Sequence, residues 1–427
     1  MVPSGPELRI RGVYPQAQEG RYMLRVKVPG GSLSATQAAA VAALSEELAG
    51  TSVHLTTRMS VELHGLSAEG LAPAWEGLGR VGLTSRGACG GAVRGVAVST
   101  PRAPAGPAAQ GLARTIHAHV TGAPRFEGLP KKFKVGVDGE AGGGRHRIQD
   151  MGLVASDREG TRFDVWVAGG LGRAPRPAFL FEHGVAADRI VPLLEAVVTV
   201  YRERAPRGKR LKHVAEEHGE EALGRWIRER WDPGARVPPE PGTAPGAPRD
   251  PGAWVDVPVF AGQLAADTLR QLAAWSRTFG DGSLVLTPDQ DLALAARSPR
   301  EAEAARRALA EIVPEAAAGG RIRCRVCPGS HECRLGLAPT REVAAAVLQA
   351  AGERAGRYSW AVSGCANSCA QPQLADVGVL CTRLVRGEGG RKTPLYDLLF
   401  RKGEGFGAAV LRRVPLEEVL AACRERL

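Results

Sequence analysis

The chain has 427 residues, of which 44% are hydrophobic and 24% charged, and its formal net charge is +11. A chain of this length can bury large cores, and we expect two or more globular domains. No apolar run approaches the roughly 18 residues that a membrane helix needs, and the opening residues "MVPSGPELRIRG" lack the apolar segment of a signal peptide. From these features we expect no membrane partner and a cytoplasmic protein.

The positive charge suits a nucleic acid, an acidic protein or an anionic small molecule. Only 5% of the residues are aromatic, and none of them alternates with basic residues as in a surface on which nucleic-acid bases stack. We therefore expect no nucleic-acid partner, and the acidic protein and the small anion remain.

In chain order, the first predicted unit is a strand, a helix and a second strand. Residues 21–28 alternate apolar and polar side chains, and a capping-box pattern at Ser34 and Gln37 starts a helix. Residues 51–67 keep the same alternation through Met59, which predicts one strand with a single buried face.

The next feature is a segment, residues 232–252, that is too rich in Pro and Gly to continue a helix or a strand. It predicts a linker between two halves. After it the strand, helix and strand recur, with the helix expected over residues 265–278. When Ser52 is laid on Ser283, the apolar residues of the two copies coincide, which indicates an internal repeat.

The repeat extends beyond this unit. Residues 134–139 match residues 360–364, at a spacing of about 230 residues that is nearly constant along the repeat. Each half is therefore predicted to contain a small β-α-β unit followed by a larger α/β unit, and the whole chain is predicted to be a pseudo-dimer. Two pairs of aspartates also match, Asp150 with Asp376 and Asp164 with Asp397.

The two copies differ in their charged residues. Arg58 of the first copy matches Asp289 of the second, and the basic segment "LPKKFK", residues 129–134, has no basic counterpart. The clustered cysteines, in contrast, lie in the second copy. This division predicts a metal centre from one half that meets an anion pocket from the other, because ligand sites favour such interfaces.

Two short segments contain half of the cysteines in a chain that has only eight. A zinc site would more often show C-x2-C pairs, whereas an iron-sulfur cluster needs four thiolates and tolerates varied spacing. The spacing therefore favours an iron-sulfur cluster, while a zinc ion and unliganded buried thiols remain open. The four candidates are Cys327, Cys333, Cys365 and Cys369.

Four other cysteines lie outside this set. The pair Cys324 and Cys327 is the one C-x2-C spacing that zinc could use. We expect Cys89, Cys381 and Cys423 to pack in the core, as unliganded thiols usually do.

The sequence resembles a known family, the sirohaem and [4Fe-4S] sulfite and nitrite reductases. The segments "CPGSHEC" and "SGCANSCAQPQLADVGVL" resemble its cluster signature, and "GRYMLRVKVPGG", "LTTRMSVELHGL", "VRGV", "LPKKFK" and "FDVWVAGGLG" resemble its first half in order. The resemblance covers nearly the whole chain. It implies an α+β fold with a pseudo-twofold repeat of a ferredoxin-like unit plus a sirohaem and [4Fe-4S]-binding α/β unit.

The resemblance divides the chain into five parts. They are a ferredoxin-like half domain (1–78), a sirohaem and anion-binding domain (79–231), the linker (232–252), a second ferredoxin-like half domain (253–318) and a [4Fe-4S] and sirohaem-binding domain (319–427).

The resemblance also implies roles for particular residues. The four candidate cysteines would bind the cluster, and Cys369 would also be the axial thiolate that bridges to the sirohaem iron. Four cations would hold the substrate anion over the open face of sirohaem: Arg58, Arg94, Lys132 and Lys134.

The implied reaction is the six-electron reduction of sulfite to sulfide, because in family patterns a lysine at Lys134 marks sulfite reductases and an asparagine marks nitrite reductases. Two alternatives remain, the reduction of nitrite to ammonia and the tetrapyrrole oxygenation of the related precorrin-3B synthase. The chain has no G-x-G-x-x-G turn for a nucleotide cofactor, so electrons are expected from a separate donor such as an acidic ferredoxin. The basic run at residues 201–213 could contact that donor or the sirohaem carboxylates, or lie in solvent.

Overall fold

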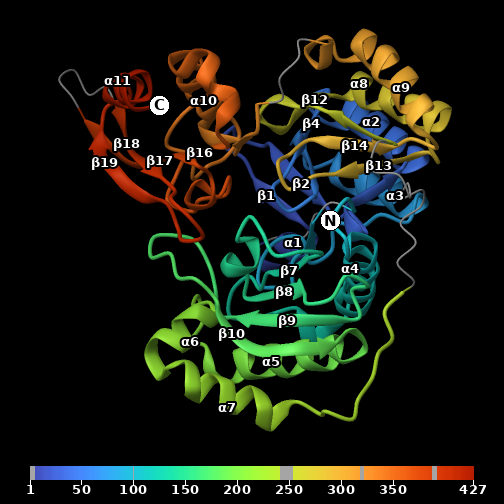
Figure 1. Cartoon of the computed structure of the whole chain (residues 1–427), viewed down its shortest axis with the longest axis vertical. Helices are drawn as coiled ribbons and strands as arrows, with labels where there is room; N and C mark the ends of the chain where they lie inside the picture. Colours follow the sequence, from blue (N-terminus) through green and yellow to red (C-terminus); the bar gives the residue numbers. More distant parts are fainter. Residues whose placement is uncertain (1–4, 100, 241–252, 318–321, 387–391) are drawn as a thin grey trace.

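The computed structural model describes residues 5–99, 101–240, 253–317, 322–386 and 392–427. Figure 1 shows the two ferredoxin-like units together in blue and gold, the first α/β unit in green below them, and the second in orange to red on the other side. Among the described residues, no helix is long and apolar enough to cross a membrane.

The two ferredoxin-like units have the same order of elements. The chain enters through α1 (Pro6–Ile10) and β1 (Val13–Pro15). The first unit contains β2 (Tyr22–Val26), β3 (Ser32–Ser34), α2 (Ala35–Leu48), β4 (Ser52–Leu55), β5 (Val61–Leu66) and α3 (Leu71–Arg80). The second contains β11 (Trp254–Val257), β12 (Gln263–Ala265), α8 (Ala266–Phe279), β13 (Ser283–Leu286), β14 (Leu292–Ala295) and α9 (Pro299–Ile312).

These units exchange a strand. β12 of the second unit pairs with β4 of the first, and β3 of the first pairs with β13 of the second. Ala265 lies opposite Ser52 and Ser34 lies opposite Ser283, so the two pairings have the same register. Helices α2 and α8 pack against each other (Figure 1). The exchange makes the two halves one body, which the sequence repeat alone did not predict.

The two larger units also share one topology. Their sheets have the orders β10-β9-β8-β7-β6 and β15-β16-β17-β18-β19. In each sheet three strands run parallel, followed by two antiparallel strands.

The bounds of these elements follow. The first unit has β6 (Ala97–Val98), α4 (Gly106–Val120), β7 (Val135–Asp138), β8 (Met151–Ala155), β9 (Arg162–Val167), β10 (Phe179–Ala186), α5 (Ile190–Arg204), α6 (Leu211–His218) and α7 (Glu220–Arg230). The second has β15 (Cys324–Val326), α10 (Thr340–Ala351), β16 (Trp360–Ser363), β17 (Val377–Arg386), β18 (Lys392–Phe400), β19 (Ala408–Val414) and α11 (Leu416–Arg426).

The predicted repeat is confirmed at the level of single contacts. The Asp150 carboxylate accepts a hydrogen bond from the backbone N–H of Lys134 at 2.8 Å, and the matched Asp376 accepts one from Ser359 at 2.7 Å. Both carboxylates thus tie the entry of one parallel strand to the start of the next. The α+β fold with repeated ferredoxin-like units is the fold that the sequence predicted.

The prediction of a single strand over residues 51–67 is wrong. This segment is a hairpin, in which β4 and β5 pair antiparallel around a turn at residues 56–60. The Thr56 hydroxyl accepts hydrogen bonds from the N–H groups of Arg58 and Ser60, and Met59 has a left-handed φ of 55°. The alternation of apolar and polar residues continues through the turn because Met59 is buried there by a contact outside the hairpin.

That contact joins the small units to the large ones. The Met59 sulfur accepts a hydrogen bond from the N–H of Val98 in β6 at 3.3 Å. At the matched turn of the second half, Gln290 has a φ of 69°, and its side-chain oxygen accepts from the N–H of Val326 in β15 at 2.6 Å. Each turn therefore docks one ferredoxin-like unit onto the first strand of an α/β sheet.

The remaining expectations concern segments. The helix predicted over residues 265–278 is α8, shifted by one residue. Residues 232–240 of the predicted linker contain no helix or strand, and residues 241–252 lie outside the described residues. The domain boundaries at residues 78, 231, 252 and 318 stay a prediction.

Replacing Gln290 with alanine should destabilise the protein. Gln290 is 1% exposed, and its side chain pairs with the N–H of Val326 and the carbonyls of Leu55 and Val326. The loss leaves buried polar groups unpaired, so we expect the free energy of unfolding to fall by about 3 kcal/mol in urea denaturation. The matched control is Gln271→Ala on the exposed face of α8, which should change it by less than about 0.5 kcal/mol. An equal effect of the two changes would contradict the docking role of the turn.

Candidate functional site

The four candidate cysteines lie in two loops that leave neighbouring strands. Cys327 directly follows β15, and Cys365 follows β16 after one residue. These strands are parallel, so both loops leave the same edge of the sheet, where ligands of α/β folds usually bind. Cys333 and Cys369 are further along the same two loops and are exposed.

The thiols lie within electrostatic reach of one another. Burial, followed by the charge of Cys369, raises the pKa of the Cys327 thiol above its ordinary value. The same two causes raise the pKa of Cys365 to about 11. Burial, opposed by backbone N–H groups, also raises the pKa of Cys333, and Cys369 adds to the rise. Thiolates gathered in this way need a shared positive group.

The chemistry of these donors fits an iron-sulfur cluster. The N–H of Gly364 donates to the Cys327 sulfur at 3.2 Å, the type of contact that tunes such clusters. Within the described ranges, no three His, Cys, Asp or Glu side chains are arranged to hold one metal ion.

The other cysteines are buried in the described structure, as expected. Cys381 and Cys423 belong to the core of the second α/β unit, and Cys89 is fully buried. Cys324 is 6% exposed and packs in that same core, so the C-x2-C pair does not face a common ligand.

The first anion candidate, Arg58, is in the turn between β4 and β5. Its guanidinium donates to the carbonyls of Gly95 at 2.6 Å and Val135 at 3.0 Å and to the side-chain oxygen of Gln149 at 2.8 Å. Burial and then the charge of Arg94 lower the pKa of Arg58 to about 9, which leaves it charged at neutral pH. The structure thus fixes this cation between the first ferredoxin-like unit and the first α/β sheet.

The two candidate lysines lie beside Arg58 and Cys369. Burial lowers the pKa of Lys132 to about 8, and the thiolate of Cys369 counteracts this. The pKa of Lys134 is also lowered, by burial and then by the charges of Lys132 and Arg58. The structure brings both lysines, Arg58 and the exposed Cys369 together, although they come from opposite halves.

Arg94 is also near this group but turns toward its own loop. It is 7% exposed, and its guanidinium donates to the carbonyls of Ala88 and Gly90, the latter at 2.8 Å. Its Nε is buried without a partner in the described structure. Its charge lowers the pKa values of Arg58 and Lys132, which places it near these two cations.

Sequence reasoning missed an additional cation, Arg210. It is 4% exposed and donates to both oxygens of the buried Asp150, at 2.6 and 3.3 Å. Its charge also lowers the pKa values of Lys132 and Lys134. The signal lay in the basic run at residues 201–213, but a charged run does not reveal which of its members is buried.

A hydrogen bond connects the two sides of the site. Thr57 directly precedes Arg58 in the chain, and its hydroxyl donates a hydrogen bond to the carbonyl of Cys369 at 3.0 Å. The arrangement therefore places several like charges next to an exposed thiol. Such a cationic pocket fits a polyanionic tetrapyrrole whose iron takes a thiolate ligand, and it leaves charge to hold a small anion.

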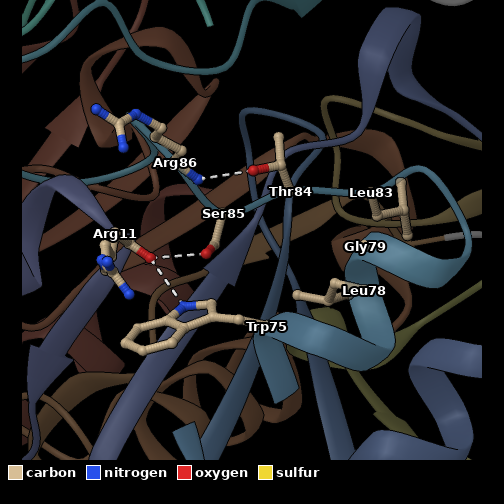
Figure 2. Close-up of a pocket in the computed structure, with 8 residues that line it drawn as sticks. All are labelled: Arg11, Trp75, Leu78, Gly79, Leu83, Thr84, Ser85 and Arg86. Atoms are coloured by element: carbon tan, nitrogen blue, oxygen red, sulfur yellow. Dashed lines mark hydrogen bonds between the residues drawn. The ribbon is translucent and has the colours of Figure 1, made fainter. Parts of the chain in front are cut away.

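The described residues also line a cavity of about 230 Å³ that lies apart from these groups. In Figure 2, Arg11 lies over the Trp75 ring, and its carbonyl accepts hydrogen bonds from Trp75 and Ser85. None of its lining residues is a candidate cysteine or cation, so we give it no part in the site.

Two family models match the chain. The "Nitrite/Sulfite reductase ferredoxin-like half domain" matches residues 14–81 and again residues 247–312. The "Nitrite and sulphite reductase 4Fe-4S domain" matches residues 107–233, which is the first copy of the α/β unit. The candidate cysteines lie in the second copy, outside that match, so their assignment as ligands stays a prediction.

Known relatives agree with the family models. The chain is 30% identical over 406 residues to a ferredoxin–nitrite reductase of Synechococcus elongatus, covering 87% of this chain and 78% of the relative. It is 27% identical to sulfite reductase [ferredoxin] 2 of Mycolicibacterium paratuberculosis, covering 87% and 72%. The solved structure of the NirA protein of Mycobacterium tuberculosis has the same fold, with a TM-score of 0.81, 23% identity and coverage of 98% and 85%. The chain therefore belongs to the nitrite and sulfite reductase family, and its cofactors are sirohaem and a [4Fe-4S] cluster.

Proposed function

We propose that the protein reduces sulfite to sulfide with six electrons. The observation that carries this proposal is the pair Lys132 and Lys134 beside Arg58 and Cys369. Near neutral pH sulfite is a mixture of the dianion and hydrogen sulfite, both with three oxygens, whereas nitrite has one charge and two oxygens. A second ammonium group in a partly dry pocket therefore favours sulfite through Coulomb attraction.

In this proposal Cys327, Cys333, Cys365 and Cys369 would hold the cluster, and Cys369 would also hold the sirohaem iron. When bound, the two cofactors would supply the electrons and the iron that takes the anion. Cys333 and Cys369 are both exposed, but Cys369, unlike Cys333, is among the main charges that act on Lys132 and Lys134, which supports its place at the junction.

The side chains of the pocket supply charge and protons. In the balanced reaction, one hydrogen sulfite ion takes up six electrons and seven protons and yields one hydrogen sulfide and three waters, so each oxygen must leave as water. Lys132, with a pKa of about 8, is protonated at neutral pH yet gives up its proton readily. Arg58 and Arg94 stabilise the negative charge that builds on the departing oxygens, a role worth about 3 kcal/mol per well-placed donor.

The electrons are proposed to come from a separate protein, an acidic ferredoxin or a similar donor. Relatives of this chain are named ferredoxin–nitrite reductase and sulfite reductase [ferredoxin]. The net charge of +11 supports electrostatic steering of an acidic donor.

Nitrite reduction to ammonia is the second candidate. It is favoured by the relative at 30% identity, which is named a nitrite reductase. The two candidates differ only in the preferred anion and share the cofactors and the site.

The cofactor ligands can be tested on the anaerobically purified protein. We expect about four cluster irons and one sirohaem iron per chain. Cys369→Ser should disturb both chromophores in the visible spectrum, because this thiol is proposed to serve both. Cys324→Ser is the matched control and should retain them, since Cys324 packs in the core. Stoichiometric zinc without visible absorption would overturn the proposal, and a cluster without sirohaem would favour the tetrapyrrole oxygenase.

The preferred anion can be tested by steady-state kinetics with one reduced donor. We expect a higher kcat/KM for sulfite than for nitrite, and Lys134→Asn should shift the ratio toward nitrite by roughly tenfold, because it removes the amine of a half-buried side chain. A wild-type preference for nitrite, or a ratio that Lys134→Asn leaves unchanged, would defeat the assignment to sulfite and leave the cofactors standing.

The role of Arg58 can be tested against its counterpart in the repeat. Arg58→Ala should lower kcat/KM by about 100-fold with cofactors retained, as expected for a charge that acts on the departing oxygen. Asp289 has another task, since it accepts hydrogen bonds from Arg145 at 2.9 Å and from the buried Arg325 at 3.0 Å. Asp289→Asn should therefore lower stability and keep kcat/KM within about twofold. Equal losses of kcat/KM in both variants would contradict the division of labour.

A further inference from the structure

Lys27 is a buried lysine that the proposed mechanism does not use. It follows β2 and is 1% exposed, one of the largest fully buried side chains of the chain. In the described structure its Nζ makes one hydrogen bond, to the Thr121 hydroxyl at 3.2 Å. An ammonium group has three donors, so a buried one with a single partner is costly.

The surroundings of Lys27 place it behind two candidate cations. The stem of Lys27 lies beside Gly95, where an added β-carbon would be 3.7 Å from the Lys27 Cγ. The carbonyl of Gly95 accepts a hydrogen bond from Arg58. The Lys27 Nζ lies beside Gly87, where an added β-carbon would be 3.0 Å away, in the loop whose carbonyls accept hydrogen bonds from Arg94. Lys27 therefore contacts the backbone that positions both arginines.

Three other charged or titratable groups face Lys27. Arg94 repels its positive charge, and Glu127, which is paired with Arg86, attracts it. Burial and then Lys27 lower the pKa of His117, which is thus neutral here. Burial, followed by Arg94, lowers the pKa of Lys27 itself to about 7. A small change in nearby charge is therefore enough to change its protonation at neutral pH.

We propose that Lys27 is a positioning residue that takes up a proton when the substrate anion binds at Arg58 and Arg94, so that anion binding is coupled to proton uptake. The proposal rests on the proposed function of this pocket. The bound anion offsets the charge of Arg94, which removes the repulsion, and the proton comes from solvent on the side of the partly exposed Thr121.

The sign of the pH dependence follows from linkage. Below the pKa of Lys27 in the free protein, about 7, the ammonium is present before and after binding and contributes its full attraction. The anion raises this pKa, so the contribution is lost as the pH rises through the higher value of the complex. At pH 9 we expect Lys27 to be neutral and to contribute little.

The test compares the holoenzyme with Lys27→Met and Lys27→Gln. Nitrite is the probe, because its charge does not change between pH 6 and pH 9. At pH 6 both variants should raise KM for nitrite by about fivefold, as loss of one nearby charge predicts, and at pH 9 they should match the wild type. Lys402→Met removes an exposed lysine and is the matched control, with no change at either pH.

Calorimetry gives a readout that a purely structural role would not move. Nitrite binding to the oxidised holoenzyme, measured at pH 7.5 in two buffers of different ionisation enthalpy, should take up fewer protons in both variants than in the wild type. The same KM ratio at pH 6 and pH 9, or equal proton uptake, would overturn the proposal. An enzyme that reduces neither anion would instead overturn the proposed function, so the two failures are distinguishable.

Discussion

The hydrogen bond from Thr57 to the carbonyl of Cys369 is the contact on which the site depends. It joins a turn of the first ferredoxin-like unit to a loop of the second α/β unit. Arg58 follows Thr57 directly, so the same hydrogen bond fixes the distance between Arg58, the cation proposed to bind the anion, and Cys369, the thiolate proposed to bridge the two cofactors. The docking of Met59 on β6 fixes the turn from the other side. The turn therefore has little freedom, and a rigid turn suits a cation that must meet charge in the transition state.

The second constraint is the crowding of like charges. Burial and then neighbouring cations lower the pKa values of Arg58 and Lys134, and Arg210 is one of these neighbours. Asp150 compensates for part of this charge through its pair with Arg210. A folded protein tolerates such a group where anionic ligands repay its cost, and sirohaem and a small oxyanion are ligands of this kind. In the proposed function, the same crowding, which lowers the pKa values of both lysines, lets one arrangement serve anion binding and proton supply.

The sequence predicted the fold better than it predicted the contacts between distant segments. The repeat matched Asp150 with Asp376 and Asp164 with Asp397. In the structure, Asp150 and Asp376 each accept from the N–H just before the preceding parallel strand, and Asp164 and Asp397 each accept from an N–H of the following strand. The sequence could not reveal the strand exchange, because pairing between distant strands leaves no local pattern. It also misread residues 56–60 as strand, since a buried residue in a left-handed turn kept the period of two. Arg210 was missed because burial of a charge depends on a distant partner.

The two halves of the duplicated scaffold match in their docking turns and differ in the charged residues beside them. Met59 and Gln290 perform the same docking, so the scaffold is symmetric where it only has to hold the units together. The symmetry ends at the residue that precedes each docking residue. Arg58 donates to the carbonyl of Val135 in the first sheet, whereas Asp289 accepts a hydrogen bond from Arg325 in the second. Arg325 in turn donates to the carbonyl of Ala370, next to Cys369. The acidic residue of the second copy thus braces the loop of Cys369 through Arg325, whereas the basic residue of the first copy is the one proposed to bind the anion. A symmetric pair of arginines would compete for one anion, whereas this exchange of charge gives each half a different task at a shared interface.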